Sequence, residues 1–302
     1  MAVFVNTNYS ALQGQRYLNN VNNSLTTTYQ RLSSGMRINS AKDDAAGLQI
    51  ADRLTSQING LNQGNRNASD GIALAQTMEA GMDEISGMLQ KIRTLAVQAN
   101  NGTNTKEDRD ALSKEASALV SEIQRISQQT TYGGKKILKG AKTDDTIYTK
   151  DATNGSKGGI MTLQVGSNKG DTISFSVANF TFSVLAKVAT AGFTKTKEVS
   201  TALAITFTTG GAEKLIESVD KIIAAVDGQR ANLGAIQNRL ESSIRNQSNV
   251  AANEADARSR IRDADFAEES ANLSQQSIIQ QAAASMLMQA NTRPQLGLSL
   301  LG

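Results

Sequence analysis

The sequence contains neither cysteine nor histidine, and these two absences exclude several classes of protein at once. Without cysteine, a disulfide framework, an iron–sulfur cluster and a thiol nucleophile are all impossible. Without histidine as well, zinc sites of the Cys/His kind and catalytic pairs such as Ser–His are excluded. Only carboxylate or Ser–Lys chemistry stays formally open, so the sequence predicts no catalytic residues, no metal ion and no cofactor.

Tryptophan is absent, aromatic residues make up 4% of the 302 residues, and Pro294 is the single proline. A chain so poor in aromatic rings and helix breakers favours long helices that pack along narrow apolar seams. The net charge is only +3, and the basic residues are scattered without the interleaved aromatic residues that bind single strands. We therefore expect no nucleic-acid partner.

Two further signals are missing from the sequence. The first ten residues lack the basic segment and the apolar stretch of a cleaved signal peptide. No window approaches the roughly 20 apolar residues of a transmembrane helix. We therefore expect no membrane insertion and, for work outside the cell, an export route that uses no cleaved signal.

Both ends of the chain are helix-patterned and almost without charge. Arg16 is the only charged residue among 1–30, and Arg293 is the only one among 270–302. A helix in water normally carries charge on its wet face, whereas these carry Asn, Gln, Ser and Thr. The pattern predicts that the two ends bury against each other and against further copies, as in the subunit of a polymer. The alternative is a plain intramolecular helix pair.

Apolar residues recur at helical spacing along most of the chain. Residues 11–34 carry a heptad seam formed by Leu18, Val21, Leu25 and Leu32. Ser40, with Asp43 three residues later, reads as the start of the next helix. A regular seam from Met78 to Ala99 ends at a turn over 100–102.

The following helix starts after Thr105, where Asp108 occupies the capping-box position, and Gly133-Gly134 is expected to end it. Alternation then replaces the helical period and predicts a β-hairpin over 161–177.

The strongest seam in the second half runs from Leu215 to Ile261, and a last helix continues from Phe266 until Arg293-Pro294 stops it. The pattern therefore predicts a mainly α fold. Long antiparallel helices would form a coiled-coil rod, with a small β-hairpin region and discontinuous domains.

Several continuous motifs resemble bacterial flagellin. They are Asn8-Tyr-Ser-Ala-Leu12, the run from Leu32 to Gly47, Leu89 to Gln98, Ala257 to Phe266, Gln280-Gln-Ala and the ending Leu298-Ser-Leu-Leu301. The similarity covers roughly residues 1–178 and 212–302. The resemblance implies a structural subunit that polymerises into the flagellar filament for motility, with terminal helices that fold on assembly. A hook–filament junction protein, or another axial flagellar protein, is the alternative.

The resemblance also implies a division into domains. An inner coiled-coil domain would comprise 1–42 and 262–302. An outer helical rod domain would comprise 43–178 and 212–261, and 179–211 would be a short vestigial variable insert. Self-assembly through the inner coiled coil is expected to use eight residues: Leu18, Val21, Leu25, Leu32, Leu273, Ile279, Ala283 and Leu287.

Several partners follow from the resemblance alone. They are copies of the same chain, flagellar cap and hook-junction proteins, an export chaperone on Leu273 to Leu301, and the flagellar type III export apparatus, which would place the protein in the extracellular flagellum. A host Toll-like receptor that senses flagellin would contact Gln90, Lys91, Leu95 and Glu115. The family carries Arg at position 91, and Lys cannot make the same planar contact. The Thr/Ser-rich insert could carry O-linked sugars.

Other functions find less support in the residues. Asp263 with Asp265, or Asp43 with Asp44, could suggest a metal site, but paired acids at a helix start more often interact with the helix dipole. The zinc peptidase that some flagellins carry needs histidine, so the sequence excludes it. Neither end has the basic amphipathic face of a membrane-active helix.

Overall fold

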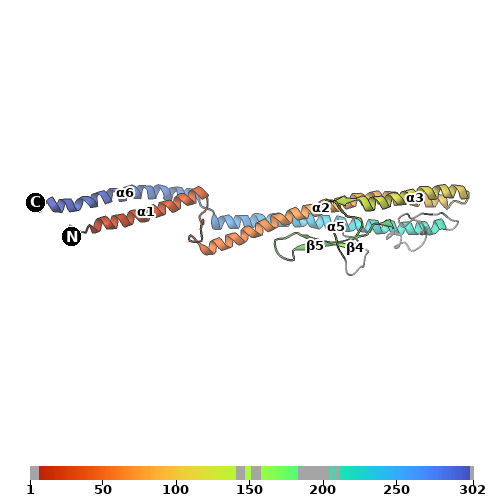
Figure 1. Ribbon diagram of the computed structural model, residues 1–302, viewed down its shortest axis with the longest axis horizontal. Helices are drawn as coiled ribbons and strands as arrows, with labels where there is room; N and C mark the ends of the chain where they lie inside the picture. The colour runs from red at the N-terminus through yellow and green to blue at the C-terminus, as the bar shows by residue number, and fades with distance from the viewer. Residues whose placement is uncertain are drawn as a thin grey trace. The chain divides into compact units, whose positions relative to one another are not determined.

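The computed structural model describes residues 7–140, 147–150, 158–182, 205, 207 and 211–299. Its helices are α1 (Tyr9–Ser34), α2 (Ala45–Ala99), α3 (Lys106–Gln129), α5 (Gly211–Arg262) and α6 (Phe266–Ser299), shown in Figure 1. The strands are β1 (Thr131–Tyr132), β2 (Lys135–Lys136), β3 (Thr149–Lys150), β4 (Gly158–Gln164) and β5 (Thr172–Ala178). The predicted mainly helical fold with a small hairpin region is confirmed. Most of the predicted insert, 179–211, lies outside the described residues.

The chain separates into two compact units. Unit 1 comprises Met1–Ile58 and Ala251–Gly302, and unit 2 comprises Asn59–Val250. Helices α1 and α6 belong to unit 1, α3 and the strands belong to unit 2, and α2 and α5 contribute to both. Unit 1 therefore combines two segments from opposite ends of the sequence, whereas unit 2 is a single continuous segment.

Unit 2 contains the main apolar core, which lies where α2, α3 and α5 run alongside one another (Figure 1). The predicted seam of α2 is confirmed, because each of its residues is at most 2% exposed: Met78, Met82, Ile85, Leu89, Ile92, Ala96 and Ala99. The seam of α5 is likewise buried from Leu215 to Leu240. It breaks down at Val250, which is 37% exposed, and Ala251 is buried instead.

Paired side chains fix the antiparallel order of α2 and α5 in unit 2. Arg93 Nε donates to Asp220 Oδ1 at 2.6 Å, and Gln237 Nε2 donates to Glu79 Oε2 at 3.0 Å. Arg93 lies further along α2 than Glu79, whereas its partner Asp220 lies nearer the start of α5 than Gln237. The two helices therefore run in opposite directions. Polar positions within the seam also find partners, since Gln229 donates to the Ser176 carbonyl of β5 at 2.9 Å.

The two ends of α3 differ in how well the sequence predicted them. The capping box is confirmed: Asp108 N–H donates to Thr105 Oγ1, and Thr105 N–H donates to Asp108 Oδ2. The hydrogen bonds that the Asp108 carboxylate accepts from the N–H and the hydroxyl of Thr105 lower the pKa of Asp108. The prediction that Gly133-Gly134 ends the helix is wrong, because α3 ends at Gln129. Both glycines have positive φ and form the tight turn between β1 and β2.

The predicted β-hairpin is confirmed as β4 and β5, with Met161 opposite Phe175 and Leu163 opposite Ile173. It lies against α2, where Asn67 Nδ2 donates to the Gln164 carbonyl at 2.9 Å. A Cβ atom added at Gly64 would lie 2.0 Å from the Val165 carbonyl oxygen. The missing side chain at Gly64 thus lets the hairpin backbone approach the helix closely.

Gly64→Ala is therefore expected to destabilise unit 2 by about 1–3 kcal/mol, because helix and hairpin must move apart. Urea unfolding of the free chain measures this loss. Gly87→Ala is the matched control in the same helix, since nothing lies within 4 Å of a Cβ added there. That control should stabilise by up to about 1 kcal/mol through helix propensity. Two changes of the same sign would contradict the proposed contact.

The predicted helix start at Ser40 is wrong by a few residues. Ser40 N–H and Oγ donate to Asp43 Oδ2 at 2.9 and 3.0 Å, but this closes a turn, and α2 begins at Ala45. Asp44 caps the helix instead, with its Oδ1 accepting from Gly47 N–H at 2.9 Å. A capping pattern alone does not distinguish the turn from the helix that follows it.

Candidate self-assembly surface

Helices α1 and α6 lie side by side in unit 1 (Figure 1) and are antiparallel. Asn22 Oδ1 accepts from Gln280 Nε2 at 2.8 Å, and Thr28 Oγ1 donates to Gln276 Oε1 at 3.2 Å. Nearer the end of α1, Arg31 forms an ion pair with Glu269 at 3.2 Å. Uncharged amides and hydroxyls thus make most of the named cross-helix contacts, and such polar positions can fix the register of a helix pair.

Helix α6 does not stop at Arg293-Pro294, as the sequence predicted, but continues to Ser299. A proline inside a helix has no N–H, so the carbonyl four residues earlier loses its usual donor. Here that carbonyl belongs to Ala290, and Asn8 Nδ2 donates to it at 2.8 Å. The same Asn8 caps α1, because its Oδ1 accepts from Ala11 N–H at 3.1 Å. The side-chain amide of Asn8 therefore caps α1 and also supplies the hydrogen bond that the Ala290 carbonyl of α6 would otherwise lack.

Asn8→Ala is expected to weaken the α1–α6 pair by about 1–3 kcal/mol, the sum of a lost cap and a carbonyl left without a donor. Asn8→Asp separates the two parts, since a carboxylate still caps α1 but cannot donate to Ala290. It should lose part of the stability that Asn8→Ala loses. Thermal dissociation of filaments measures both variants, and an unchanged midpoint for Asn8→Ala would contradict the double role.

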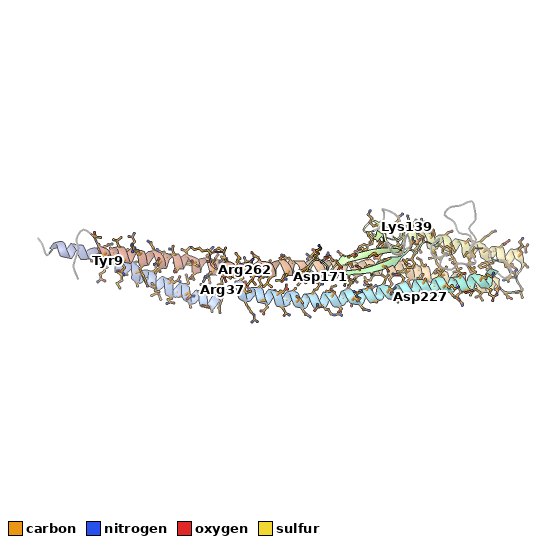
Figure 2. All side chains as sticks on the ribbon, turned by 90° about the horizontal axis from the view of Figure 1, so that it is seen from below. Tyr9, Arg37, Lys139, Asp171, Asp227 and Arg262 are labelled. Carbon is orange, nitrogen blue, oxygen red and sulfur yellow. The ribbon has the colours of Figure 1, made fainter. Side chains whose placement is uncertain are left out.

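Backbone hydrogen bonds connect the two segments of unit 1 near the end of α1 and the start of α6. Arg37 N–H donates to the Arg262 carbonyl at 2.7 Å, and Ala264 N–H donates to the Gly35 carbonyl at 3.0 Å. Arg37 and Arg262 are labelled in Figure 2. Gly35 ends α1 with a φ of 68°, which favours glycine. The segments that follow α1 and precede α6 are therefore joined.

The eight residues expected to drive self-assembly all lie on α1 or α6. Val21 and Ala283 are buried, and the other six are half-buried: Leu18, Leu25, Leu32, Leu273, Ile279 and Leu287. The structure thus brings the two sets together on paired helices. One partner helix covers the six half-buried side chains only in part.

Large apolar side chains remain exposed over unit 1. Among the described residues, every exposed large apolar side chain except Val97 and Val250 belongs to this unit. Tyr9 is 72% exposed, Met286 69% and Ile278 67%. Exposed large apolar side chains that gather on one pair of helices are typical of an interaction surface. The surface that we call the assembly face therefore comprises α1 and α6 with these side chains.

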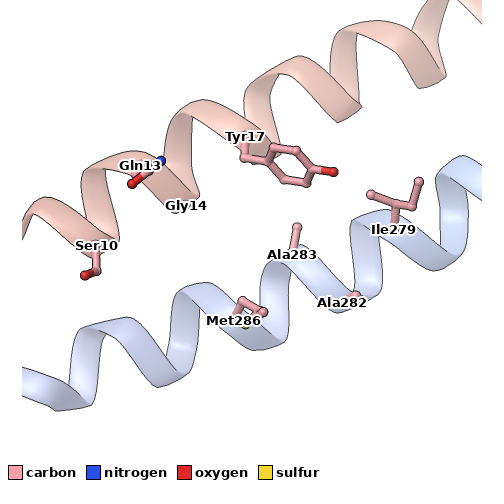
Figure 3. A pocket seen from close by; sticks show the side chains of 8 residues that line it. All are labelled: Ser10, Gln13, Gly14, Tyr17, Ile279, Ala282, Ala283 and Met286. Carbon is pink, nitrogen blue, oxygen red and sulfur yellow. The ribbon is translucent and has the colours of Figure 1, made fainter.

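A groove of about 570 Å³ runs between α1 and α6 in this face (Figure 3). It is lined by Ser10, Gln13, Gly14, Tyr17, Ile279, Ala282, Ala283 and Met286. A Cβ atom added at Gly14 would lie only 3.2 Å from Leu287 Cδ1, so the helices approach closely there. No lining residue is charged, which suits contact with another uncharged, apolar helix.

Sequence reasoning missed Tyr17, Ile278 and Met286, which are exposed members of the assembly face. The seam analysis selected residues at heptad spacing, and these three lie off that seam. A usable signal was present nevertheless, since large apolar residues occur off the seam in helices that lack charge.

The candidate receptor residues lie in unit 2, on α2 and α3. Gln90, Lys91 and Glu115 are exposed, and Lys91 Nζ lies 3.2 Å from Glu115 Oε1 in an ion pair. Leu95 is only 7% exposed and belongs to the core. The structure therefore brings Lys91 and Glu115 together at the surface but directs Leu95 inward.

The acids weighed as metal ligands act locally. Asp265 Oδ1 accepts from Ala267 N–H at 2.8 Å at the start of α6, and Asp263 Oδ2 accepts from Ser259 Oγ at 2.6 Å. Over the part of the chain that the structure describes, no three acidic side chains gather closely enough to hold a metal ion. Nor does any described helix combine the length and hydropathy needed to cross a bilayer.

Comparison with known proteins decides the family. The model of the bacterial flagellin N-terminal helical region matches residues 5–143, and that of the C-terminal helical region matches 216–301. The chain belongs to the bacterial flagellin family. Like its relatives, it is a structural subunit of the flagellar filament.

Two relatives show how this flagellin compares along its length. It is 35% identical to flagellin B of Vibrio anguillarum and 35% identical to polar flagellin C of Vibrio parahaemolyticus, with both chains of each pair covered in full. These alignments span 377 and 383 positions. Since this flagellin has 302 residues, the relatives carry residues with no counterpart here. It is thus a compact member of the family.

The fold also recurs in a solved structure described as a flagellar hook-associated protein from Vibrio parahaemolyticus. That structure has a TM-score of 0.55 and covers 73% of this flagellin and 100% of its own chain, at 17% identity. At such low identity the likeness shows the shared fold alone.

Proposed function

We propose that α1 and α6 are the assembly elements of this flagellin and form the inner filament-core domain, 1–42 with 262–302. Copies of the chain would cover the exposed Tyr9, Ile278 and Met286. The observation that carries the proposal is that large apolar side chains stay exposed on helices almost without charge. In a filament the uncharged surfaces of neighbouring subunits would meet, and the apolar area would leave water.

Folding of these helices on assembly follows from the same surface. Ordering a residue costs about 1–2 kcal/mol of conformational entropy. Unit 1 buries few large side chains on α1 and α6, since Val21 and Ala283 are their buried apolar residues among those described. The intramolecular pair alone therefore offsets this cost poorly, and the copies supply the missing burial.

The outer rod domain, 43–178 with 212–261, is proposed to remain folded in the free subunit. Its apolar core between α2, α3 and α5 needs no second copy, because the seam residues are already buried within one chain. The stretch 179–211 is proposed as a short vestigial variable insert. The division separates a part that is stable alone from a part that depends on assembly.

Further partners are proposed from the family. They are the flagellar cap and hook-junction proteins, an export chaperone on the segment from Leu273 to Leu301, and export through the type III apparatus to the extracellular flagellum. The uncharged, half-buried face of α6 suits a chaperone that covers it before export. We also propose that the protein has no catalytic activity.

A host Toll-like receptor is a second proposed partner, with Gln90, Lys91 and Glu115 as contacts. Their exposure and the Lys91–Glu115 pair support an accessible polar patch. Leu95 would act indirectly, by holding α2 in place. Receptor reporter assays on Gln90→Ala and on Leu95→Ala test this: the first should signal less while unfolding normally, and the second should be less stable.

Seeded polymerisation tests the main proposal. Circular dichroism of the purified chain should show more helix per residue after short filament seeds are added, and electron microscopy should show helical tubes. Growth without a gain in helix would contradict folding on assembly. Failure to grow on seeds would contradict the filament function itself.

A further inference from the structure

The methionines that the structure describes differ widely in their exposure to solvent. Met78 and Met82 in α2 are 0% exposed. Met286 and Met288 in α6 are 69% and 66% exposed. An exposed methionine sulfur is more accessible to oxidants than a buried one. Among the methionines that the structure describes, Met286 and Met288 are therefore the two whose sulfur atoms are most open to attack by an oxidant.

Met286 also lines the groove of the assembly face, whereas Met288 does not (Figure 3). Its neighbours in the lining include Tyr17, Ile279 and Ala283. A flexible thioether fits an apolar groove of this kind well, because it adapts its shape to the occupant. The same side chain is therefore open to solvent and placed where a second copy would dock.

We propose that Met286 is an oxidation site that controls entry of the subunit into the filament. The oxidant is a peroxide or hypohalous acid. With hydrogen peroxide, the sulfur attacks one oxygen, the O–O bond breaks, an S–O bond forms, and water leaves. Sulfur is oxidised by two electrons and the peroxide is reduced by two. The inference rests on the proposed assembly function of the groove.

The product changes the groove in two ways. Methionine sulfoxide is polar and chiral, so it replaces an apolar surface by an oxygen that needs hydrogen-bond partners. Closing a second copy over that oxygen would remove its water, and a polar group buried without a partner is unfavourable. The subunit concentration needed for growth should rise by about tenfold. Assembly in turn covers Met286, so a completed filament should resist the same oxidant.

The test compares the wild-type chain with Met286→Leu and Met288→Leu. Each purified subunit is treated with hydrogen peroxide, its methionines are quantified by peptide mass spectrometry, and its growth on untreated seeds is measured. Growth after treatment is divided by the growth of the same variant before treatment, so any effect of the leucine itself cancels. Treated wild type is finally incubated with a methionine sulfoxide reductase.

We expect growth to fall about tenfold for treated wild type, to fall less for treated Met286→Leu than for treated Met288→Leu, and to return after reduction. Met286 should also oxidise faster in free subunits than in filaments. An equal fall for Met286→Leu, or equal oxidation of Met286 in both states, would overturn the inference. Untreated wild type that fails to grow on seeds would instead contradict the proposed function.

Discussion

Ile278→Glu is expected to abolish filament growth while leaving the free subunit as stable as wild type. Ile278 is 67% exposed in the single chain, so a carboxylate there stays in water. Exposed substitutions of this kind change the free energy of unfolding by about 0.5 kcal/mol or less. In a filament built through the assembly face, the same carboxylate would be buried without a partner, which costs at least about 3 kcal/mol.

That cost should raise the subunit concentration needed for growth by about a hundredfold or more. Sedimentation of polymer at a series of subunit concentrations measures it. Ala118→Glu is the matched control, because Ala118 is an exposed residue of α3 and belongs to unit 2, whereas α1 and α6 belong to unit 1. It should grow near the wild-type concentration. Normal growth of Ile278→Glu would show that α6 is not covered by a neighbouring copy at this position.

Leu89→Ala is expected to lower the free energy of unfolding of the free subunit by about 2–5 kcal/mol, the usual cost of a cavity in a closed core. Leu89 is 0% exposed in the seam of α2. The main apolar core lies in unit 2 and needs no second copy, so this loss should appear before assembly.

The control for Leu89→Ala removes the same side chain from the other unit. Leu12 is 50% exposed on α1, and Leu12→Ala should change the unfolding of the free subunit by less than about 1 kcal/mol. Urea denaturation followed by circular dichroism measures both variants. Equal losses at the two positions would mean that α1 and unit 2 unfold together, contrary to the proposed division.

The structure shows why the long seams were predictable and several boundaries were not. The seam from Met78 to Ala99 is buried because residues spaced alternately three and four apart lie on one face of a helix. Gly133-Gly134 forms a strand turn rather than a helix end, since positive φ serves either purpose equally well. The local signal therefore identified a boundary between secondary-structure elements without showing whether those elements are helices or strands.

Pro294 shows how a distant residue can override a local rule. Its missing N–H predicts a helix end, yet α6 continues because Asn8 supplies the Ala290 carbonyl with a donor. These two residues lie 282 positions apart in the sequence. No pattern near Pro294 carries this information, which arises only when α1 and α6 pair.

The pairing of α1 with α6 was predictable from the sequence, but the set of side chains that stay exposed on these helices was not. The lack of charge at both ends of the sequence indicated the elements that would bury together, and α1 and α6 do pair. The heptad seam selected side chains that face the intramolecular partner. Tyr17, which lines the groove between the two helices, and Ile278 lie off that seam and stay exposed. They can be identified only once the pairing of α1 with α6 is known.

Hydrogen–deuterium exchange of free subunits and of filaments tests the central claim most directly. We predict that peptides from Tyr9–Ser34 and Phe266–Ser299 exchange quickly in the free subunit and become strongly protected in filaments. Peptides from the buried seam of α2 should be protected equally in both states. Terminal helices already protected in the free subunit would contradict the claim that a many-copy assembly gives them their stability.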